Sequence, residues 1–154
     1  MNVAVLTVSD RASSGEYPDE GGPLLQRLVA DAGGSVTAHA VVPDDQAAIE
    51  KILIEWSSRP DVDVILTTGG TGFGARDVTP EATRAVIDRD APGIAEAMRA
   101  AGLRVTPFAA LGRQVAGIKG RTLIVNLPGA LKAAAECMDA LVPVLPHAVE
   151  MLRA

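Results

Sequence analysis

Short apolar segments alternate along this chain with longer amphipathic segments. The apolar segments Val3 to Val8, Val36 to Val42 and Val62 to Thr68 are too short for ordinary helices, and the third contains a continuous run of Val, Ile and Leu. Such runs are typical of strands that are buried on both faces of a parallel sheet. The pattern therefore predicts an α/β fold, with a mostly parallel central sheet and helices on both of its faces.

Glycine, proline and capping residues mark the ends of the predicted helices. Two short apolar arms around Lys119-Gly120 predict a hairpin or bulged turn before the last strand. The remaining amphipathic segments predict helices over residues 21–33, after Pro43-Asp44-Asp45, from Thr79 to about Arg89, from Pro92 to near Gly102, and over most of residues 130–152 with a break near Pro143.

Composition and charge argue against several classes of protein. The chain has 154 residues and a formal net charge of −5, and its cations lie singly along the sequence. The length suits one domain over residues 1–154, and the charge argues against a nucleic-acid partner. No apolar run reaches the roughly twenty residues that cross a bilayer, and the first eight residues lack the cationic start of a signal peptide. We therefore expect a cytoplasmic protein with no membrane partner.

Cysteine and histidine provide no obvious metal site. Cys137 is the only cysteine, and it is expected to be a small buried residue and not a nucleophile. His39 and His147 have no second His or Cys at metal-ligand spacing, so both are expected to be structural.

The loop over residues 68–77 contains the most informative motif. Gly69, Gly70, Gly72 and Gly74 follow a buried strand directly. Glycines at this density allow the backbone N–H groups to approach a bulky anion, whereas the alternative is a flexible surface loop. The loop lacks the Lys of a Walker motif, and a proline at position 80 argues against a dinucleotide fingerprint. We predict a cradle for phosphate.

Asp44 and Asp77 lie in loops that follow neighbouring strands, and they are the candidate ligands of a divalent cation. Two carboxylates could hold a Mg²⁺ ion that bridges triphosphate oxygens during displacement at phosphorus. Two structural alternatives remain open, since Asp44 could cap the following helix and Asp77 could pair with Arg76.

The loops after the first and last strands provide weaker signals. Ser9 and Asp10 follow the first strand, where such residues are commonly turn or capping residues. Asn126 opens the segment Asn126-Leu-Pro-Gly129, and its amide could present donors and acceptors at the rim of a ligand site. A purely structural turn is an equal alternative for this segment.

Several of these motifs together resemble the molybdenum cofactor biosynthesis family, which includes molybdopterin adenylyltransferases and the amino-terminal domain of gephyrin. The resemblance spans nearly the whole chain. It rests on Thr7-Val-Ser-Asp-Arg, Gly15-x-Tyr-x-Asp19-x-x-Gly22-Pro, Val42-Pro-Asp44, Thr67-Thr-Gly-Gly-Thr-Gly-Phe, Arg76-Asp-Val-Thr-Pro-Glu-Ala-Thr83, Ala116-Gly-Ile-x-Gly and Asn126-Leu-Pro-Gly129.

The resemblance implies a three-layer α/β domain that assembles as a homotrimer. It implies Mg²⁺-dependent transfer of AMP from ATP to molybdopterin, with release of pyrophosphate, and a downstream metal-insertion protein as a further partner. Asp44 and Asp77 match the family's catalytic carboxylates and would hold the metal. The implied contacts to substrate are Ser9, Asp10, Gly69, Gly70, Thr71, Gly72, Glu81, Asn126, Pro128 and Gly129.

Two departures from the family pattern lie near the expected site. Gly112 precedes Arg113 where many members have Ser, and Ala130-Leu131 follows the Asn-Leu-Pro-Gly segment where relatives often have a polar or small residue with Pro. Both bear on substrate affinity more than on the fold. A non-catalytic pterin-binding or scaffolding protein, and an enzyme of the same fold acting on another nucleotide, are the alternative functions. The sequence does not distinguish a molybdenum pathway from a tungsten pathway.

Overall fold

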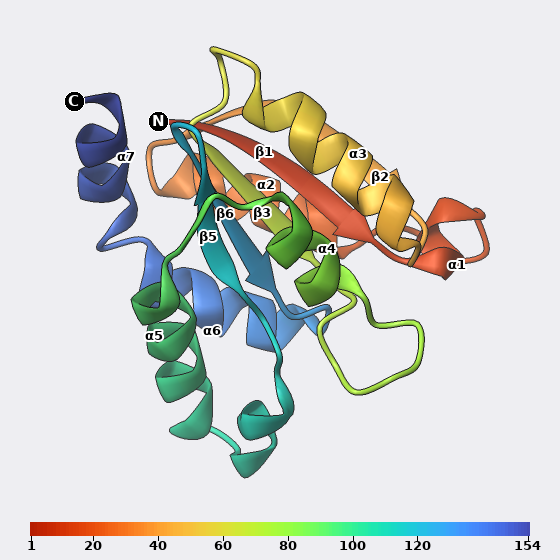
Figure 1. Cartoon of the computed structure of the whole chain (residues 1–154). Coiled ribbons are helices and arrows are strands. Elements are labelled where there is room, and N and C mark those ends of the chain that lie inside the picture. The colour runs from red at the N-terminus through yellow and green to blue at the C-terminus, as the bar shows by residue number, and fades with distance from the viewer.

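Six strands form one sheet in the computed structural model, which describes residues 1–154 (Figure 1). Strands β2, β1, β3 and β6 run parallel, and β5 runs antiparallel to both of its neighbours. The prediction of a mostly parallel sheet is therefore confirmed. In the order of the sheet, the strands are β2 (Ser35–Val42), β1 (Asn2–Val8), β3 (Val64–Thr68), β6 (Thr122–Leu127), β5 (Ala116–Lys119) and β4 (Arg89–Asp90).

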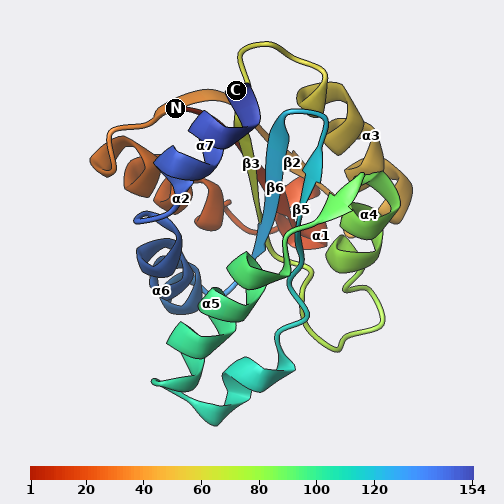
Figure 2. The same ribbon diagram turned by 60° about the vertical axis from the view of Figure 1, so that its left-hand side comes forward.

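Helices cover both faces of this sheet and give three layers. Figure 2 shows α2, α5, α6 and α7 on one side of the strands, with α3 and α4 on the other. The helices are α2 (Gly21–Asp31), α3 (Gln46–Ser57), α4 (Thr79–Val86), α5 (Pro92–Leu103), α6 (Leu131–Leu141) and α7 (Leu145–Arg153), with the short α1 (Asp10–Ser13) and the 3₁₀ helix η1 (Pro107–Leu111).

Alternate side chains of the central strands supply two separate cores. Val3 and Val5 of β1 pack with α2, α6 and α7, whereas Ala4 and Leu6 pack with α3 and α4. This arrangement follows from the strand geometry, because successive side chains point to opposite faces of a sheet. It explains why β1, β3 and β6 consist of almost continuous apolar residues.

The connections between strands place a crevice at the carboxyl ends of β1 and β3. The chain runs from β1 to β2 on one side of β1, and from β2 to β3 on the other side. Ligands of open α/β sheets usually bind where the strand order reverses in this way. The loops that follow β1 and β3 carry the Ser9-Asp10 and glycine-rich motifs.

Most element boundaries match the sequence patterns, with one clear exception. The hairpin at Gly120, which has φ of 60°, and the break between α6 and α7 are both confirmed. Helix α4 ends at Val86 and not near Arg89, because Arg89 pairs with Ile118 to form the short strand β4. None of the helices is long and apolar enough to cross a membrane.

Candidate functional site

The predicted site loops converge at the carboxyl edge of the sheet. The N–H of Asp10 donates to a carboxylate oxygen of Asp44 at 2.9 Å, and the N–H of Asp44 donates to Asp10 at 3.0 Å. The hydroxyl of Thr68, at the end of β3, donates to the carbonyl of Pro128 at 2.9 Å. The first two bonds join the loops after β1 and β2, and the third joins the end of β3 to the loop after β6, so the residues predicted from four separate segments lie along one edge.

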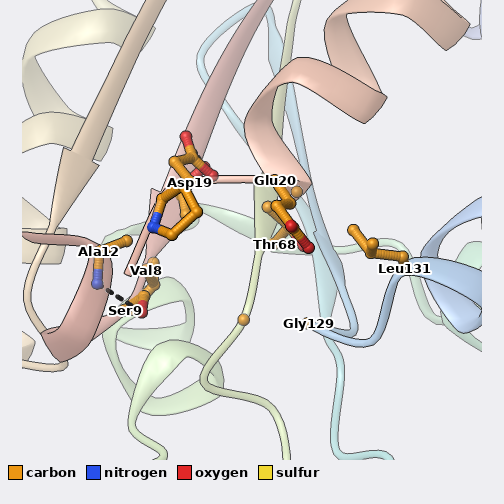
Figure 3. A pocket seen from close by; sticks show the side chains of 12 residues that line it. Val8, Ser9, Ala12, Asp19, Glu20, Thr68, Gly129 and Leu131 are labelled. Atoms are coloured by element: carbon orange, nitrogen blue, oxygen red, sulfur yellow. Dashed lines mark hydrogen bonds between the residues drawn. The ribbon is translucent and has the colours of Figure 1, made fainter. Parts of the chain in front are cut away.

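A pocket of about 260 Å³ opens beside this junction (Figure 3). It lies between the ends of β1 and β3 and the start of α2, whose N-cap residue Glu20 forms no capping hydrogen bond through its side chain. In the first turn of α2 the N–H of Gly22 donates to Asp19 and Pro23 has no N–H, so the N–H of Gly21 is the free donor that could attract an anion. The lining residues include Thr7, Ser9, Asp19, Glu20, Gly21, Thr68, Gly69, Gly129 and Leu131.

Asp19 belongs to this pocket, although sequence reasoning assigns it no role beyond its place in a motif. Its carboxylate accepts hydrogen bonds from the Thr7 hydroxyl at 3.0 Å and from the N–H of Gly22 at 3.0 Å. A Cβ atom at Gly22 would lie 2.8 Å from the Thr7 hydroxyl oxygen, so glycine permits this close approach. The Asp19-x-x-Gly22 spacing in the sequence could have predicted this hydrogen bond, because an aspartate often accepts from an N–H three residues ahead.

The glycine loop over residues 68–77 presents backbone donors, as the sequence predicts. Gly69 and Gly70 have φ of 101° and 69°, a left-handed conformation that glycine adopts without a Cβ clash. The N–H groups of residues 70–73 donate to no protein atom, whereas the N–H of Gly74 donates to Asp77 at 2.9 Å. Successive free N–H groups in such a loop form an anion-binding concavity.

Asp44 is not the cap of the helix that follows it. The side chain of Asp45 accepts from the N–H of Ala48 at 2.9 Å and caps α3. The Asp44 carboxylate instead faces the site, where one oxygen lies 3.2 Å from the position a Cβ would take at Gly70. Burial raises the pKa of the Asp44 carboxyl, and the negative charges of Asp10 and Asp77 raise it further against the opposing hydrogen bond from Asp10.

Asp77 is likewise not paired with its neighbour Arg76. The Arg76 guanidinium binds both oxygens of Asp10, at 2.6 and 3.0 Å, and this hydrogen bonding holds the pKa of the Asp10 carboxyl below its usual value. The Asp77 side chain accepts only from Gly74 within the loop. Both structural alternatives from the sequence are therefore wrong, and Asp44 and Asp77 retain oxygens that are free to bind a ligand.

The carboxylates present here fit a magnesium site of the type completed by substrate. No group of three or more His, Cys, Asp or Glu side chains converges anywhere in the protein. Mg²⁺ is commonly bound by one or two carboxylates together with water and substrate phosphates, so two carboxylates are sufficient. Burial is the main cause of the raised pKa of Asp44, and the neighbouring charges of Asp10 and Asp77 add to it, so a bound cation would favour the charged carboxylate.

Three residues that are expected from the sequence to contact substrate form side-chain hydrogen bonds within the protein, although Ser9 also lines the pocket. Asn126 does not lie at a rim: its side chain is fully buried and bonds to Thr67, Thr83 and the N–H of Val115. The oxygen and the nitrogen of its side-chain amide therefore both have hydrogen-bond partners inside the protein, as buried polar groups usually do. The Ser9 hydroxyl accepts from the N–H of Ala12 at 3.1 Å, which confirms the capping alternative.

Glu81, the third of these residues, is bound by Arg113, which the sequence did not single out as functional. Two nitrogens of the Arg113 guanidinium donate to the Glu81 carboxylate at 2.7 and 3.1 Å. These bonds hold the pKa of Glu81 below its usual value. Of the residues that depart from the family pattern, Leu131 lines the pocket, whereas Gly112 ends η1 outside it.

The parallel sheet, the pocket at its carboxyl edge and the row of free N–H groups are typical of α/β proteins that bind phosphate esters. The comparison with known families is more specific. Residues 4–147 match the family model described as "Probable molybdopterin binding domain", and the chain belongs to this molybdenum cofactor biosynthesis family.

Relatives in several organisms agree with this assignment. The molybdopterin adenylyltransferase of Helicobacter pylori strain J99 is 40% identical over 154 residues, which cover 99% of this chain and 88% of that protein. The crystal structure of the molybdopterin biosynthesis enzyme MoaB from Thermus thermophilus is 50% identical with a TM-score of 0.92, covering 98% of this chain and 95% of that one. The Drosophila melanogaster molybdenum cofactor synthesis protein cinnamon is 41% identical, but the match spans only 26% of its length.

Proposed function

We propose that this chain is a molybdopterin adenylyltransferase, which transfers AMP from ATP to the phosphate of molybdopterin. The observation that carries the proposal is the placement of the Asp44 carboxylate beside Gly70 and of the Asp77 carboxylate beside Gly72, next to the free N–H groups of residues 70–73. The activity named for the Helicobacter relative supports it. Residues 1–154 would act as one domain, since both helical layers pack against the same sheet.

In the proposed reaction, an oxygen of the molybdopterin phosphate attacks the α-phosphorus of ATP. The bond from that phosphorus to the oxygen bridging it to the β-phosphate breaks, and pyrophosphate leaves. The free N–H groups of the glycine loop would bind phosphate oxygens and stabilise the charge that develops on them. The pocket beside Gly69 and Gly129 would hold a phosphorylated substrate against the start of α2 and so align the reacting groups.

Asp44 and Asp77 would hold Mg²⁺, which would neutralise charge on the triphosphate and on the departing pyrophosphate. The protein's own contribution is the spacing of the two carboxylates. Asp44 is fixed by its reciprocal bonds with Asp10, and Asp77 is fixed by the N–H of Gly74.

The test is formation of pyrophosphate and adenylyl-molybdopterin from purified protein, ATP, Mg²⁺ and fresh molybdopterin. Asp77→Asn should lower turnover by about a hundredfold or more, because the amide removes a charged metal ligand. Asp139→Asn is the matched control, since the Asp139 side chain is exposed on α6 and forms no hydrogen bond or ion pair. Tight pterin binding by wild-type protein without turnover would instead favour the non-catalytic pterin-binding alternative.

The proposal extends to assembly and location. We propose a homotrimer, which the apolar side chains exposed at the end of α5 and in η1 support, Phe108 being 76% exposed. Sedimentation equilibrium should give about three times the chain mass. The adenylylated product would pass in the cytoplasm to a metal-insertion protein.

A further inference from the structure

Arg113 binds the glycine loop at three of its carbonyl groups. Its own N–H donates to the carbonyl of Thr71 at 2.9 Å. Its guanidinium Nε donates to the carbonyl of Gly72 at 2.8 Å, and Nη2 donates to the carbonyl of Asp77 at 2.8 Å. One residue therefore holds the loop near its start and again at the residue that carries the second site carboxylate.

These three bonds determine where the N–H groups of the loop point. A trans peptide is planar, so its N–H and C=O groups face opposite directions, and the chain contains no cis peptide. Because the carbonyls of Thr71, Gly72 and Asp77 face Arg113, the N–H groups of the residues that follow them face away from it. Two of these N–H groups, those of Gly72 and Phe73, are among the N–H groups of residues 70–73 that donate to no protein atom.

Glu81 fixes the orientation of the guanidinium itself. Its two carboxylate oxygens accept from Nη1 and Nη2, and Glu81 lies in the first turn of α4. With the two carbonyl bonds, four of the five guanidinium N–H groups are engaged within the protein. A side chain so fully committed has little capacity left to bind a phosphate directly.

We propose that Arg113, oriented by Glu81, is a positioning residue that turns the N–H groups of the glycine loop toward the substrate phosphates without contacting them. The expected effect of Arg113 on ATP affinity rests on the proposed adenylyltransferase function. The effect of Arg113 on the orientation of the loop is independent of that function, because it is a property of the free protein. The two parts can therefore be tested separately.

The first test uses nitrogen-15 NMR of the free protein. Arg113→Lys keeps the positive charge, but an ammonium group cannot reach two carbonyls and a carboxylate together. The amide signals of Gly72, Phe73 and Val78 should shift, whereas Arg121→Ala, in the β5–β6 turn at the opposite edge, should leave them unchanged. Unchanged loop signals in Arg113→Lys would overturn the proposal.

The second test measures ATP affinity by calorimetry. Arg113→Lys and Arg113→Ala should both weaken binding by at least about tenfold, which corresponds to the loss of one charge-assisted hydrogen bond. Glu81→Gln should weaken it less, and guanidinium ion should partly restore binding to Arg113→Ala where methylammonium does not. Wild-type affinity in Arg113→Lys would show that only the charge matters and would refute positioning. If wild-type protein binds no ATP, the proposed function fails while the NMR result still decides the orientation of the loop.

Discussion

The backbone at Gly70 couples the shape of the glycine loop to the position of Asp44. Its φ of 69° is left-handed, and a Cβ there would collide with the Thr79 hydroxyl and lie 3.2 Å from the Asp44 carboxylate. Gly70→Ala should therefore destabilise the fold by about 1–2 kcal/mol and displace Asp44, with a large loss of turnover. Urea denaturation and the pyrophosphate assay measure the two effects.

Gly93→Ala is the matched control for this substitution. Gly93 lies in the first turn of α5, has no positive φ, and a Cβ there would meet no atom within 4 Å. Alanine should leave activity intact and raise stability slightly, by about 0.4–1 kcal/mol, because it restricts the unfolded chain. Equal losses in both variants would mean that the loop geometry at Gly70 is unimportant.

The thiol of Cys137 should be almost unreactive in the folded protein. The side chain is buried in the core beside α2 and α5, and burial, with the charge of Glu136, raises its pKa from 9.0 to about 11. At about pH 8 the thiolate fraction should be about a hundredfold lower than in the unfolded chain, before access is considered. Reaction with a chromogenic disulfide in buffer and in urea measures the difference. Equally fast reaction in both would contradict the buried placement.

At the residue scale, the sequence could identify candidate carboxylates but could not assign their partners. Asp44 and Asp45 are adjacent and both suit a helix cap, and only the backbone path decides that Asp45 takes the role. Arg76 pairs with Asp10, a residue 66 positions earlier in the chain. Such distant pairs depend on the order of strands in the sheet, which local sequence patterns do not contain. The burial of the Asn126 amide could not be predicted for the same reason.

At the scale of elements, Asp63 ties the last helix to the sheet. It is 9% exposed, and its carboxylate accepts from the N–H of Asn2 at 2.7 Å and from Arg153 of α7 at 2.6 and 3.1 Å. Asp63→Ala leaves both donors without a partner and should lower the free energy of unfolding by about 1–3 kcal/mol. Urea denaturation followed by circular dichroism measures this loss.

Asp61→Ala is the control, because Asp61 forms an ion pair with Arg59 in which both side chains are substantially exposed. Exposed pairs contribute little, so a change of less than about 1 kcal/mol is expected. If Asp61→Ala lowered the free energy of unfolding as much as Asp63→Ala does, the burial of Asp63 would not make its hydrogen bonds more stabilising than an exposed ion pair.

The extent of helices and strands was predictable where it depends on local chemistry. Pro92 and the glycine pair before β2 mark helix ends that the structure confirms. The end of α4 was not predictable, because β4 exists only through pairing with β5, nearly thirty residues further along the chain. Strand pairs of two residues leave no periodic pattern in a sequence.

For the whole molecule, surface carboxylates that are bound to donors make stability depend on pH. The pKa of Glu81 is lowered from 4.5 by hydrogen bonding to Arg113, and that of Asp88 is lowered from 3.8 by the N–H of Gly120 and by Lys119. Both carboxyls bind protons less tightly in the folded state than in the unfolded state. Their stabilising contribution is therefore present above their ordinary pKa values and lost as the pH falls through the lowered ones.

The free energy of unfolding should consequently decrease as the pH is lowered from about 5 to about 3. Asp44 acts in the opposite direction, because its raised pKa makes the folded state bind a proton more readily. Urea denaturation across this range should give a smaller decrease for Glu81→Gln than for wild-type protein, since the amide cannot titrate. If the stability of wild-type protein instead rises on acidification, protonation of Asp44 stabilises the fold by more than is lost when Glu81 and Asp88 are protonated. The site, and not the surface carboxylates, would then govern how stability responds to acid.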